Sequence, residues 1–153
     1  MSDLQIRPAT RADVPEIVRL LADDQLGATR EAYGDPLPEQ YWSAWERLAA
    51  DPSELVVVGE LDGRIVATAQ ISVIPSLSRG GSSRATIEAV RVESALRGGG
   101  YGTHLIEWLI EEARSRGCAM VQLTSDATRL DAHRFYERLG FARTHVGMKL
   151  ALT

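Results

Sequence analysis

The stretch that decides the fold reads Ile87-Glu88-Ala89-Val90-Arg91-Val92 and resumes at Arg97-Gly98-Gly99-Gly100-Tyr101-Gly102. Branched and small apolar residues in its first part predict a β-strand over residues 85–93. Apolar residues at helical spacing after Gly102, including Leu105 and Leu109, predict a helix. The stretch therefore places a run of glycines between the end of a strand and the start of a helix.

Glycines at such a junction can hold a phosphate group. The first N–H groups of a helix have no acceptor inside the helix, and the helix dipole gives that end a partial positive charge. Glycine lets the backbone adopt positive φ and approach an anion closely, while Arg97 adds a charge with forked donors. The loop lacks the Gly-Lys-Ser/Thr ending of nucleoside triphosphatases and follows a late strand, unlike a dinucleotide-binding loop. A glycine-rich turn without a ligand is the remaining alternative.

The rest of the chain is predicted to alternate between strands and helices. Before the junction we expect a strand at 4–7, a helix opened by the capping pair Thr10 and Asp13, a broken segment over 24–38, a helix over 39–50 and a hairpin of strands 55–60 and 65–74. After it we expect a strand over 119–123, a short helix over 130–139 and a final strand over 141–150. This order predicts an α/β fold with a mixed sheet.

Length and composition predict one globular domain over residues 1–153, with 44% hydrophobic and 25% charged residues. The net charge of −4 argues against a nucleic-acid partner. The charge is uneven, because residues 1–62 carry 13 acidic and 5 basic side chains and the remainder is net basic. An acidic portion suits a cationic ligand and a basic portion suits a polyanion, although chance asymmetry is an equal alternative.

Several function classes find no support in the sequence. Cys118, the only cysteine, allows no internal disulfide. The three histidines, His104, His133 and His145, lack metal-ligand spacing, so we expect no metal. The first residues lack the pattern of a signal peptide, and no apolar run reaches the roughly 20 residues of a membrane span. We expect a cytoplasmic protein without a membrane partner.

Two motifs together resemble the GCN5-related N-acetyltransferase (GNAT) superfamily. The Arg-x-x-Gly-x-Gly pyrophosphate signature is matched from Arg97 to Gly102, and the Phe-Tyr-x-x-x-Gly-Phe ending is matched from Phe135 to Phe141. The likeness covers residues 4–149, and residues 21–31 resemble a bacterial subgroup. It implies a mixed, mostly antiparallel sheet of about six to seven strands with a V-shaped splay, flanked by about four helices.

The resemblance implies acetyl-coenzyme A as co-substrate, bound where the strands 85–93 and 119–124 splay apart. Its pyrophosphate then lies on the loop amides, its pantetheine arm runs along residues 90–92, and a backbone N–H near Val92 polarises the acetyl carbonyl. The family often has an asparagine seven residues before its tyrosine. This sequence has Arg129 there, which we expect to contact a phosphate instead. The implied cofactor-binding residues are Val90, Val92, Arg97, Gly98, Gly99, Gly100, Tyr101, Gly102, Thr103 and Arg129.

The family chemistry is direct attack of an amine on the thioester in a ternary complex. Tyr136 matches the family tyrosine that protonates the leaving thiolate. Packing in the core is the alternative role for Tyr136.

Glu88 is the candidate base for the proton that the amine loses, directly or through water. On a regular buried strand it shares a face with Val90 and Val92, opposite Ile87 and Ala89. An ion pair with Arg84 or Arg91 is the alternative role for Glu88.

In the family the first two helices and their connection build the acceptor site, which implies Arg30, Glu31 and Tyr33 as substrate-binding residues. The acidic N-terminal third favours a cationic amine, such as an amino sugar, whereas Arg30 and Arg79 suit a carboxylate or phosphate on the acceptor. Residues 87–92 and Gly117-Cys118 also resemble glucosamine-phosphate acetyltransferases.

The sequence thus predicts an enzyme that moves acetyl from acetyl-coenzyme A to the primary amine of a small-molecule acceptor. One alternative is an acetyltransferase for protein or peptide amines, which needs an extended acceptor groove. The other is a non-catalytic acyl-coenzyme A sensor, which needs the glycine loop but neither Tyr136 nor Glu88. A homodimer is compatible with the family, and no residue demands one.

Overall fold

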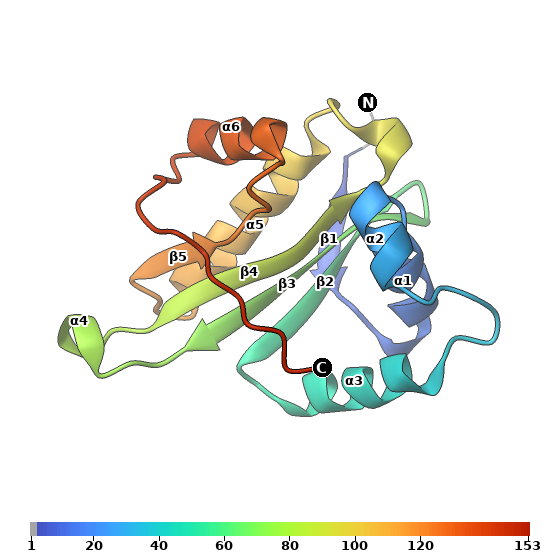
Figure 1. Cartoon of the computed structure of the whole chain (residues 1–153), viewed down its shortest axis with the longest axis horizontal. Coiled ribbons are helices and arrows are strands. Elements are labelled where there is room, and N and C mark those ends of the chain that lie inside the picture. Colours follow the sequence, from blue (N-terminus) through green and yellow to red (C-terminus); the bar gives the residue numbers. More distant parts are fainter. Residues whose placement is uncertain (1–2) are drawn as a thin grey trace.

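The computed structural model describes residues 3–153 and is an α/β structure built on one five-stranded sheet (Figure 1). Met1 and Ser2, which belong to the segment where we expected no signal peptide, lie outside the described residues. The strands follow one another across the sheet, antiparallel from the first to the fourth, with the fifth parallel to the fourth. Their bounds are β1 Gln5–Pro8, β2 Glu54–Leu61, β3 Arg64–Ile74, β4 Arg84–Val92 and β5 Met120–Leu123.

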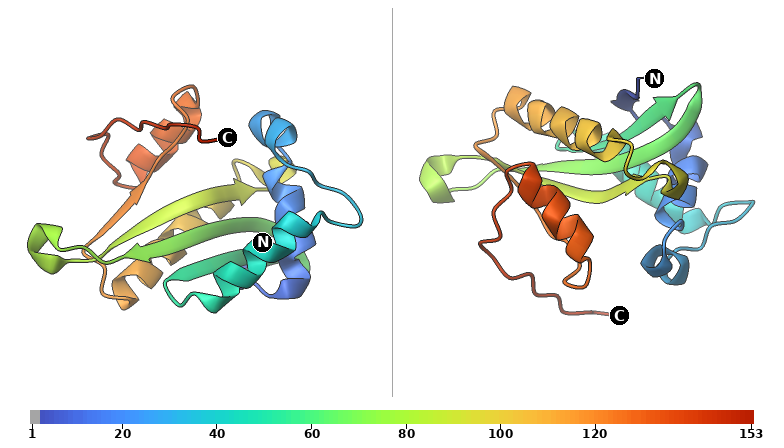
Figure 2. Two further views of the ribbon diagram at one scale, coloured as in Figure 1. Left: turned by 60° about the horizontal axis from the view of Figure 1, so that its bottom comes forward. Right: turned by 90° about the horizontal axis from the view of Figure 1, so that it is seen from above.

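Helices cover both faces of the sheet. Helix α5 packs on one face, where it also supplies the crossover that a parallel β4–β5 pair requires. Helices α1 and α3 lie on the other face, and α6 lies beside the first turns of α5 (Figure 2). The helix bounds are α1 Val14–Leu21, α2 Gln25–Arg30, α3 Glu39–Ala50, α4 Ser78–Gly81, α5 Tyr101–Ser115 and α6 Leu130–Arg138, with short 3-10 turns η1 Arg11–Asp13 and η2 Ser94–Leu96.

Local sequence signals explain several of these elements. Asp62 and Gly63 form the β2–β3 turn with φ values of 51° and 78°, as a tight hairpin with the native twist requires. The predicted helix over 39–50 is confirmed with those bounds. The predicted capping pair is also confirmed, because the Asp13 carboxylate accepts a hydrogen bond of 2.8 Å from the Thr10 N–H.

The core has two parts, one on each face of the sheet. The larger part joins the inward residues of β2, β3 and β4 to α5, where Leu105, Ile106 and Leu109 are fully buried. The smaller part joins Val14 and Val18 of α1 to α3. The sheet is therefore held between two apolar layers, which fixes the positions of the strand ends.

Two counts in the expected fold were wrong. Residues 3–153 form five strands and six helices, not six to seven strands and four helices. The expected last strand, over 141–150, runs extended but pairs with no strand in the described part of the chain. Of the additional helices, α2 forms inside a segment predicted as broken, because the Asp24 side chain caps it by accepting a hydrogen bond from the Gly27 N–H.

None of the helices found within residues 3–153 is both long enough and apolar enough to cross a bilayer.

A charged cluster ties the first strand to the first helix. The Arg7 guanidinium donates to both Asp13 carboxylate oxygens, at 2.7 Å and 3.0 Å, and to Glu60 at 2.6 Å. Asp13 is only 8% exposed. The hydrogen bonds from Arg7 are the main reason why the pKa of Asp13 lies below its usual value.

We predict that Asp13→Asn lowers the free energy of unfolding at neutral pH by about 1.5–3 kcal/mol, the range for hydrogen bonds to charged groups. A depressed folded-state pKa stabilises the fold above the unfolded pKa of about 3.9, and this stabilisation is lost as the pH falls through the folded value. Urea unfolding at several pH values should therefore show the two proteins converging in acid. The exposed Asp51→Asn is the matched control and should change stability much less. Equal losses in both variants at neutral pH contradict this assignment.

Candidate functional site

Strands β4 and β5 diverge at one side of the sheet. They pair over four residues only, from Arg84 opposite Met120 to Ile87 opposite Leu123. The second half of β4, up to Val92, continues without a partner on that side in the described part of the chain (Figure 1). This is the splay expected between these two strands, and it leaves one edge of β4 open to a ligand.

A β-bulge starts the divergence. The register between β3 and β4 shifts between Thr68 and Gln70, and Ala89 adopts a φ of 54°. Such a bulge inserts an extra residue and bends the strand. It lies beside Glu88, the candidate base.

The bulge makes the expected face assignment wrong. Val90 and Val92 pack into the same core as Ile87, on the α5 face. Glu88 lies opposite Gln70, which lines a pocket on the α1 and α3 face. Regular alternation along a strand predicts that Glu88 shares a face with Val90 and Val92. The extra residue of the bulge puts Glu88 on the opposite face.

The open edge of β4 presents a backbone donor to the cleft. The Glu93 N–H donates to the Val66 carbonyl of β3 at 2.8 Å. Because successive N–H groups of a strand point to opposite edges, the N–H of Val92 points away from β3 and toward the cleft. This is the donor that we expected to polarise an acetyl carbonyl.

The glycine loop leads from η2 into α5 at one end of the cleft. Gly98 and Gly100 both have a φ of 85°, a conformation that glycine adopts without strain. Gly100 precedes the first residue of α5, and no side chain caps the helix there. Within residues 3–153, no backbone acceptor is found for the N–H groups of Gly98, Gly100, Tyr101, Gly102 and Thr103. The loop thus offers a set of free amides at a helix start.

Close packing at Gly102 brings α6 to the same place. A β-carbon on Gly102 would lie 3.3 Å from the Phe135 ring and 3.9 Å from Val92. Gly102 therefore allows α5, α6 and the free half of β4 to meet. Tyr136, the candidate acid, follows Phe135 on α6 and packs against the same core as Val92.

Tyr136 combines an aromatic role with a free hydroxyl. Its ring makes edge-on contacts with Phe135 and Phe141, with centroids 5.0 Å and 5.8 Å apart. Burial raises its pKa above the usual value, and the positive charges of Arg129 and Arg91 act in the opposite direction. Its hydroxyl makes no hydrogen bond to any described residue, and the raised pKa keeps it protonated at neutral pH.

Glu88 is an exposed residue, although we expected a buried one. The expected alternative, an ion pair with Arg84 or Arg91, is not found among residues 3–153. Arg91 pairs instead with Asp24, at 3.0 Å. Glu88 is therefore an accessible carboxylate at the bulge.

Arginines gather around this end of the cleft. The Arg91 side chain is 14% exposed, and burial is the main reason why its pKa is lowered. Positive charge on Arg129, at the start of α6, and on Arg30, at the end of α2, lowers it further. The charges of Arg129 and Arg30 both act on Arg91, and such a group of positive charges suits a multiply charged anion. The sequence analysis did not predict Arg91 or Asp24 as site residues. The signal that could have identified Arg91 was an arginine inside an otherwise apolar strand.

The three residues expected to bind the acceptor do not meet at one point. Arg30 is exposed and donates from Nε to the Leu26 carbonyl. The Glu31 carboxylate accepts a hydrogen bond of 2.9 Å from the Tyr41 hydroxyl. Tyr33 is exposed and lines a separate cavity of about 410 Å³ beside Trp42. Of the three, Arg30 and Glu31 both act electrostatically on Arg91: the charge of Arg30 lowers the pKa of Arg91, and the charge of Glu31 raises it.

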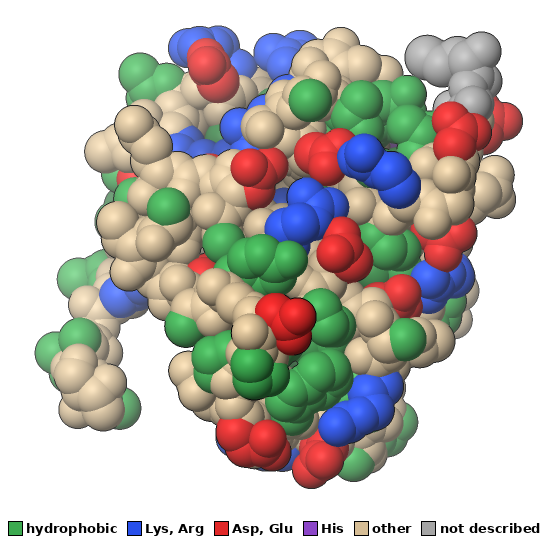
Figure 3. Space-filling model, turned by 90° about the vertical axis from the view of Figure 1, so that its right-hand side faces the viewer, with side chains coloured by type: hydrophobic (Ala, Val, Ile, Leu, Met, Phe, Trp, Pro, Cys, Tyr) green, Lys and Arg blue, Asp and Glu red, His purple; other side chains and the backbone are tan. Residues whose placement is uncertain are grey.

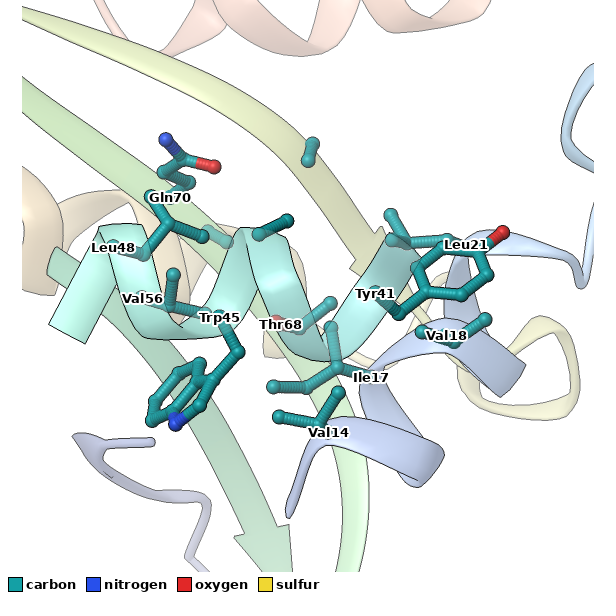
Figure 4. Close-up of a pocket in the computed structure, with 13 residues that line it drawn as sticks. Val14, Ile17, Val18, Leu21, Tyr41, Trp45, Leu48, Val56, Thr68 and Gln70 are labelled. Carbon is teal, nitrogen blue, oxygen red and sulfur yellow. The ribbon is translucent and has the colours of Figure 1, made fainter. Parts of the chain in front are cut away.

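An apolar pocket of about 170 Å³ lies between α1, α3 and the sheet. Figure 4 shows Tyr41 and Trp45 of α3 and Ile17 of α1 on its helical side, with Gln70 and Thr68 on the sheet side. Gln70 is the residue opposite Glu88. The pocket is lined by Val14, Ile17, Val18, Leu21, Tyr41, Ala44, Trp45, Leu48, Val56, Thr68, Ala69, Gln70 and Ala89.

Two further observations concern metal ions and large polyanions. No group of three or more metal-ligating side chains occurs among residues 3–153. On the face shown in Figure 3, acidic and basic side chains are interleaved and do not form one basic surface.

Known proteins match this chain in sequence and structure. The sequence matches the Acetyltransferase (GNAT) family over residues 16–141. It is 42% identical over 90 residues to glucosamine 6-phosphate N-acetyltransferase from Trypanosoma brucei brucei, covering 59% of each chain. It is 38% identical over 66 residues to aminoalkylphosphonate N-acetyltransferase from Salmonella typhimurium, covering 43% of each chain. The matched regions thus span less than two thirds of these two relatives.

One solved structure matches nearly the whole chain. A protein described as a transcriptional regulator from Bacillus halodurans C-125 superposes with a TM-score of 0.95 at 45% identity. The superposition covers 98% of this chain and 100% of that one. The fold is therefore shared almost from end to end.

Gly100 and Gly63 allow a matched test of the loop. Both have positive φ, and a β-carbon on either would meet nothing within 4 Å. We predict that Gly100→Ala weakens binding of acetyl-coenzyme A by at least ~10-fold, because a left-handed alanine costs about 1–2 kcal/mol and moves the amides. Gly63→Ala, in the distant hairpin turn, should lower stability similarly and leave binding unchanged. Calorimetric titration checks both, and equal affinities in the two variants exclude the loop as the donor site.

Proposed function

We propose that this chain, which belongs to the Acetyltransferase (GNAT) family and is an acyltransferase, moves acetyl from acetyl-coenzyme A to the primary amine of a small acceptor that carries a phosphate or phosphonate group. The observation that carries the proposal is the divergence of β4 from β5, which leaves the edge of β4 at Val90 and Val92 unpaired among the described residues. Free amides lie at the start of α5, where α6, the helix that carries Tyr136, packs against Gly102.

The donor half of the proposal assigns the pyrophosphate to the loop amides from Gly98 to Thr103, with Arg97 beside them. The unpaired edge at Val90 and Val92 supports pairing with the amide groups of the pantetheine arm, in the manner of an added strand.

The proposed reaction is direct attack within a ternary complex. The amine nitrogen forms a bond to the acetyl carbon, and the carbonyl oxygen gains negative charge near the Val92 N–H. The carbon–sulfur bond then breaks, and Tyr136 gives its proton to the departing thiolate. Glu88, directly or through a water molecule, takes the proton that the amine loses.

The phosphate half of the proposal rests on the arginines. Two relatives are named for acceptors in which an amine and a phosphate or phosphonate occur in one small molecule. Here Arg91 and Arg129 influence the titration of Tyr136, so their charges act at the end of the cleft where the thiol leaves. A guanidinium binds phosphate oxygens with two parallel hydrogen bonds. Arg30 adds a third charge from α2.

The experiment measures thiol release with a panel of acceptors. Glucosamine 6-phosphate and 2-aminoethylphosphonate should exceed glucosamine and ethylamine in kcat/KM by about 10- to 100-fold, the effect of one or two charge-assisted hydrogen bonds. Arg129→Leu should remove most of this difference, whereas Arg114→Leu, at the exposed end of α5, should not.

Other results of the panel decide between the rival functions. Turnover of peptide amines alone favours a protein acetyltransferase. Acetyl-coenzyme A binding without any thiol release favours the non-catalytic sensor, a role nearer to the description of the B. halodurans protein. Equal rates for phosphorylated and plain amines contradict the phosphate preference but leave acetyl transfer in place.

Tyr136→Phe should lower kcat by about 10²-fold or more while the Kd for acetyl-coenzyme A changes little. The reason is that the variant keeps the ring contacts and loses only the proton donor. Tyr41→Phe removes a hydroxyl from another tyrosine with a raised pKa and is the matched control. Unchanged turnover in Tyr136→Phe removes this residue from the mechanism.

Glu88→Gln should lower kcat/KM by about 10²-fold and displace the acidic limb of its pH profile, because the variant cannot accept a proton. Glu107→Gln, on the exposed side of α5, is the control and should leave the profile in place. A Glu88→Gln profile that keeps its acidic limb assigns the base to another group or a water chain.

The proposal also includes a cytoplasmic, bacterial setting and a homodimer.

A further inference from the structure

The apolar pocket between α1, α3 and the sheet has no role in the reaction proposed for phosphorylated acceptors. We propose that it binds the aromatic ring of a second class of acceptor, primary amines joined to a benzene-sized ring by a short chain, such as phenethylamine. The enzyme then also acetylates amines that carry no phosphate. This inference rests on the acetyl transfer proposed above, but it does not depend on the arginines.

The pocket has the size of a small ring. Its volume is about 170 Å³, and an apolar protein cavity of about 150 Å³ is large enough to bind benzene. Branched aliphatic side chains of α1 and the aromatic rings of Tyr41 and Trp45 on α3 surround it, as Figure 4 shows. A hydrocarbon ring in this place therefore has apolar neighbours on the helices and on the sheet.

Helix α3 lies over the pocket with an apolar stripe that the sheet does not cover. Tyr41, Ala44, Trp45 and Leu48 are three and four residues apart, the spacing of one helix face, and all four line the pocket. None of the four is buried. Such a stripe normally packs on the core, whereas here the pocket lies between it and strands β2 and β3. A bound ring removes apolar surface of both the helix and the sheet from water, which is favourable.

Hydrogen bonds within the protein leave little for a polar occupant. The Thr68 hydroxyl donates to the Val57 carbonyl at 2.9 Å, and the Tyr41 hydroxyl donates to the Glu31 carboxylate at 2.9 Å. The surface of the pocket is almost wholly apolar. A water molecule or a sugar hydroxyl needs polar partners when it is buried, whereas an aromatic ring needs none. The chemistry of the lining therefore selects a hydrocarbon group.

The pocket reaches the candidate catalytic residues at the bulge. Ala89 lines the pocket, is exposed, and is the bulge residue with a φ of 54°. Glu88 precedes it, and Val90, on the open edge of β4, follows it. A ring in the pocket thus lies near both the candidate base and the strand edge assigned to the pantetheine arm. A short chain is enough to carry an amine from the ring to this place.

Gln70 offers a hydrogen-bond acceptor to that amine. It lies opposite Glu88, and its side-chain nitrogen donates to the Glu54 carboxylate at 3.0 Å. The Ser72 hydroxyl donates to the same carboxylate oxygen at 2.6 Å, which holds Glu54 in place. Among residues 3–153, the amide oxygen of Gln70 accepts no hydrogen bond. It is therefore free to accept one from the N–H of an amine at the end of the pocket.

The reaction follows the same balance as the transfer proposed above. The amine nitrogen forms a bond to the acetyl carbon, the carbon–sulfur bond breaks, and coenzyme A leaves. One proton of the amine goes to Glu88, and the departing thiolate takes a proton from Tyr136. The products are an N-acetyl amine and free coenzyme A, and no further reactant is needed.

Thiol release with matched amines tests the proposal. Phenethylamine should exceed ethylamine in kcat/KM by about 10- to 100-fold, the effect of burying one aromatic ring. Ala44→Leu fills the pocket and should remove this advantage. Ala49→Leu, at an exposed position of the same helix, is the matched control and should keep it. Thermal unfolding of both variants shows whether they remain folded.

A second variant enlarges the pocket. Leu48→Ala removes a lining side chain, and it should raise kcat/KM for naphthylethylamine relative to phenethylamine by about 10-fold. A gain in rate with a larger ring does not follow from a loss of stability.

Calorimetry in the presence of coenzyme A, which has no acetyl group to transfer, measures binding apart from the reaction. Phenethylamine should bind at least ~10-fold more weakly to Ala44→Leu than to the wild type. An advantage over ethylamine, or an affinity, that Ala44→Leu retains overturns the inference, because the ring then binds elsewhere.

Glucosamine 6-phosphate separates this inference from the proposed function. Turnover of that acceptor, with equal kcat/KM for phenethylamine and ethylamine, overturns the inference and leaves the proposed function in place. The absence of thiol release with every amine contradicts the proposed function, and this acceptor class with it.

Discussion

The bulge at Ala89 is the constraint on which the rest of the structure depends. Up to Ile87, β4 pairs with both β3 and β5. Beyond the bulge it pairs with β3 only, among the described strands. Its open edge therefore has backbone groups that need a partner. The free amides at the start of α5 face the same gap. The fold thus concentrates unsatisfied backbone donors in one cleft, where a ligand with amide groups and phosphates can satisfy them.

The charges in this cleft come from both halves of an unevenly charged chain. Asp24, from the acidic N-terminal part, pairs with Arg91 of β4, while Arg129 comes from the start of α6. The proposed transfer to a phosphorylated amine needs both signs, because cations would hold the phosphate and a carboxylate would take the proton of the amine. The uneven charge along the sequence therefore becomes a mixed cluster in space, with no broad basic surface on the face seen in Figure 3.

Local signals in the sequence predicted most of the fold. The α3 bounds, the β2–β3 turn and the glycine junction each depend on neighbouring residues, such as Asp62 with Gly63. The bulge was not predictable, because a strand pattern assumes strict alternation and Ala89 has no special side chain. Glu88 was therefore assigned to the wrong face. The segment over 141–150 was predicted as a strand from its alternating pattern, but it pairs with no strand among residues 3–153.

Some residues of the candidate site could be predicted from local sequence motifs, whereas others depended on contacts between distant segments. Motif positions placed the loop and Tyr136 together, since both lie on helix ends that pack at Gly102. The acceptor residues depended on loop geometry, and Arg30, Glu31 and Tyr33 separate in space. Arg91 lies in the site because it pairs with Asp24, a residue far away in the sequence. No local sequence pattern predicts such a pair.

Hydrogen exchange with and without saturating acetyl-coenzyme A tests the central claim most directly. If the cleft holds the donor, amides of residues 98–103 and of Val90 and Val92 should become protected, while those of the β2–β3 turn at Asp62 and Gly63 should not. Binding without protection at the loop and along β4 contradicts the assignment of this cleft as the donor site.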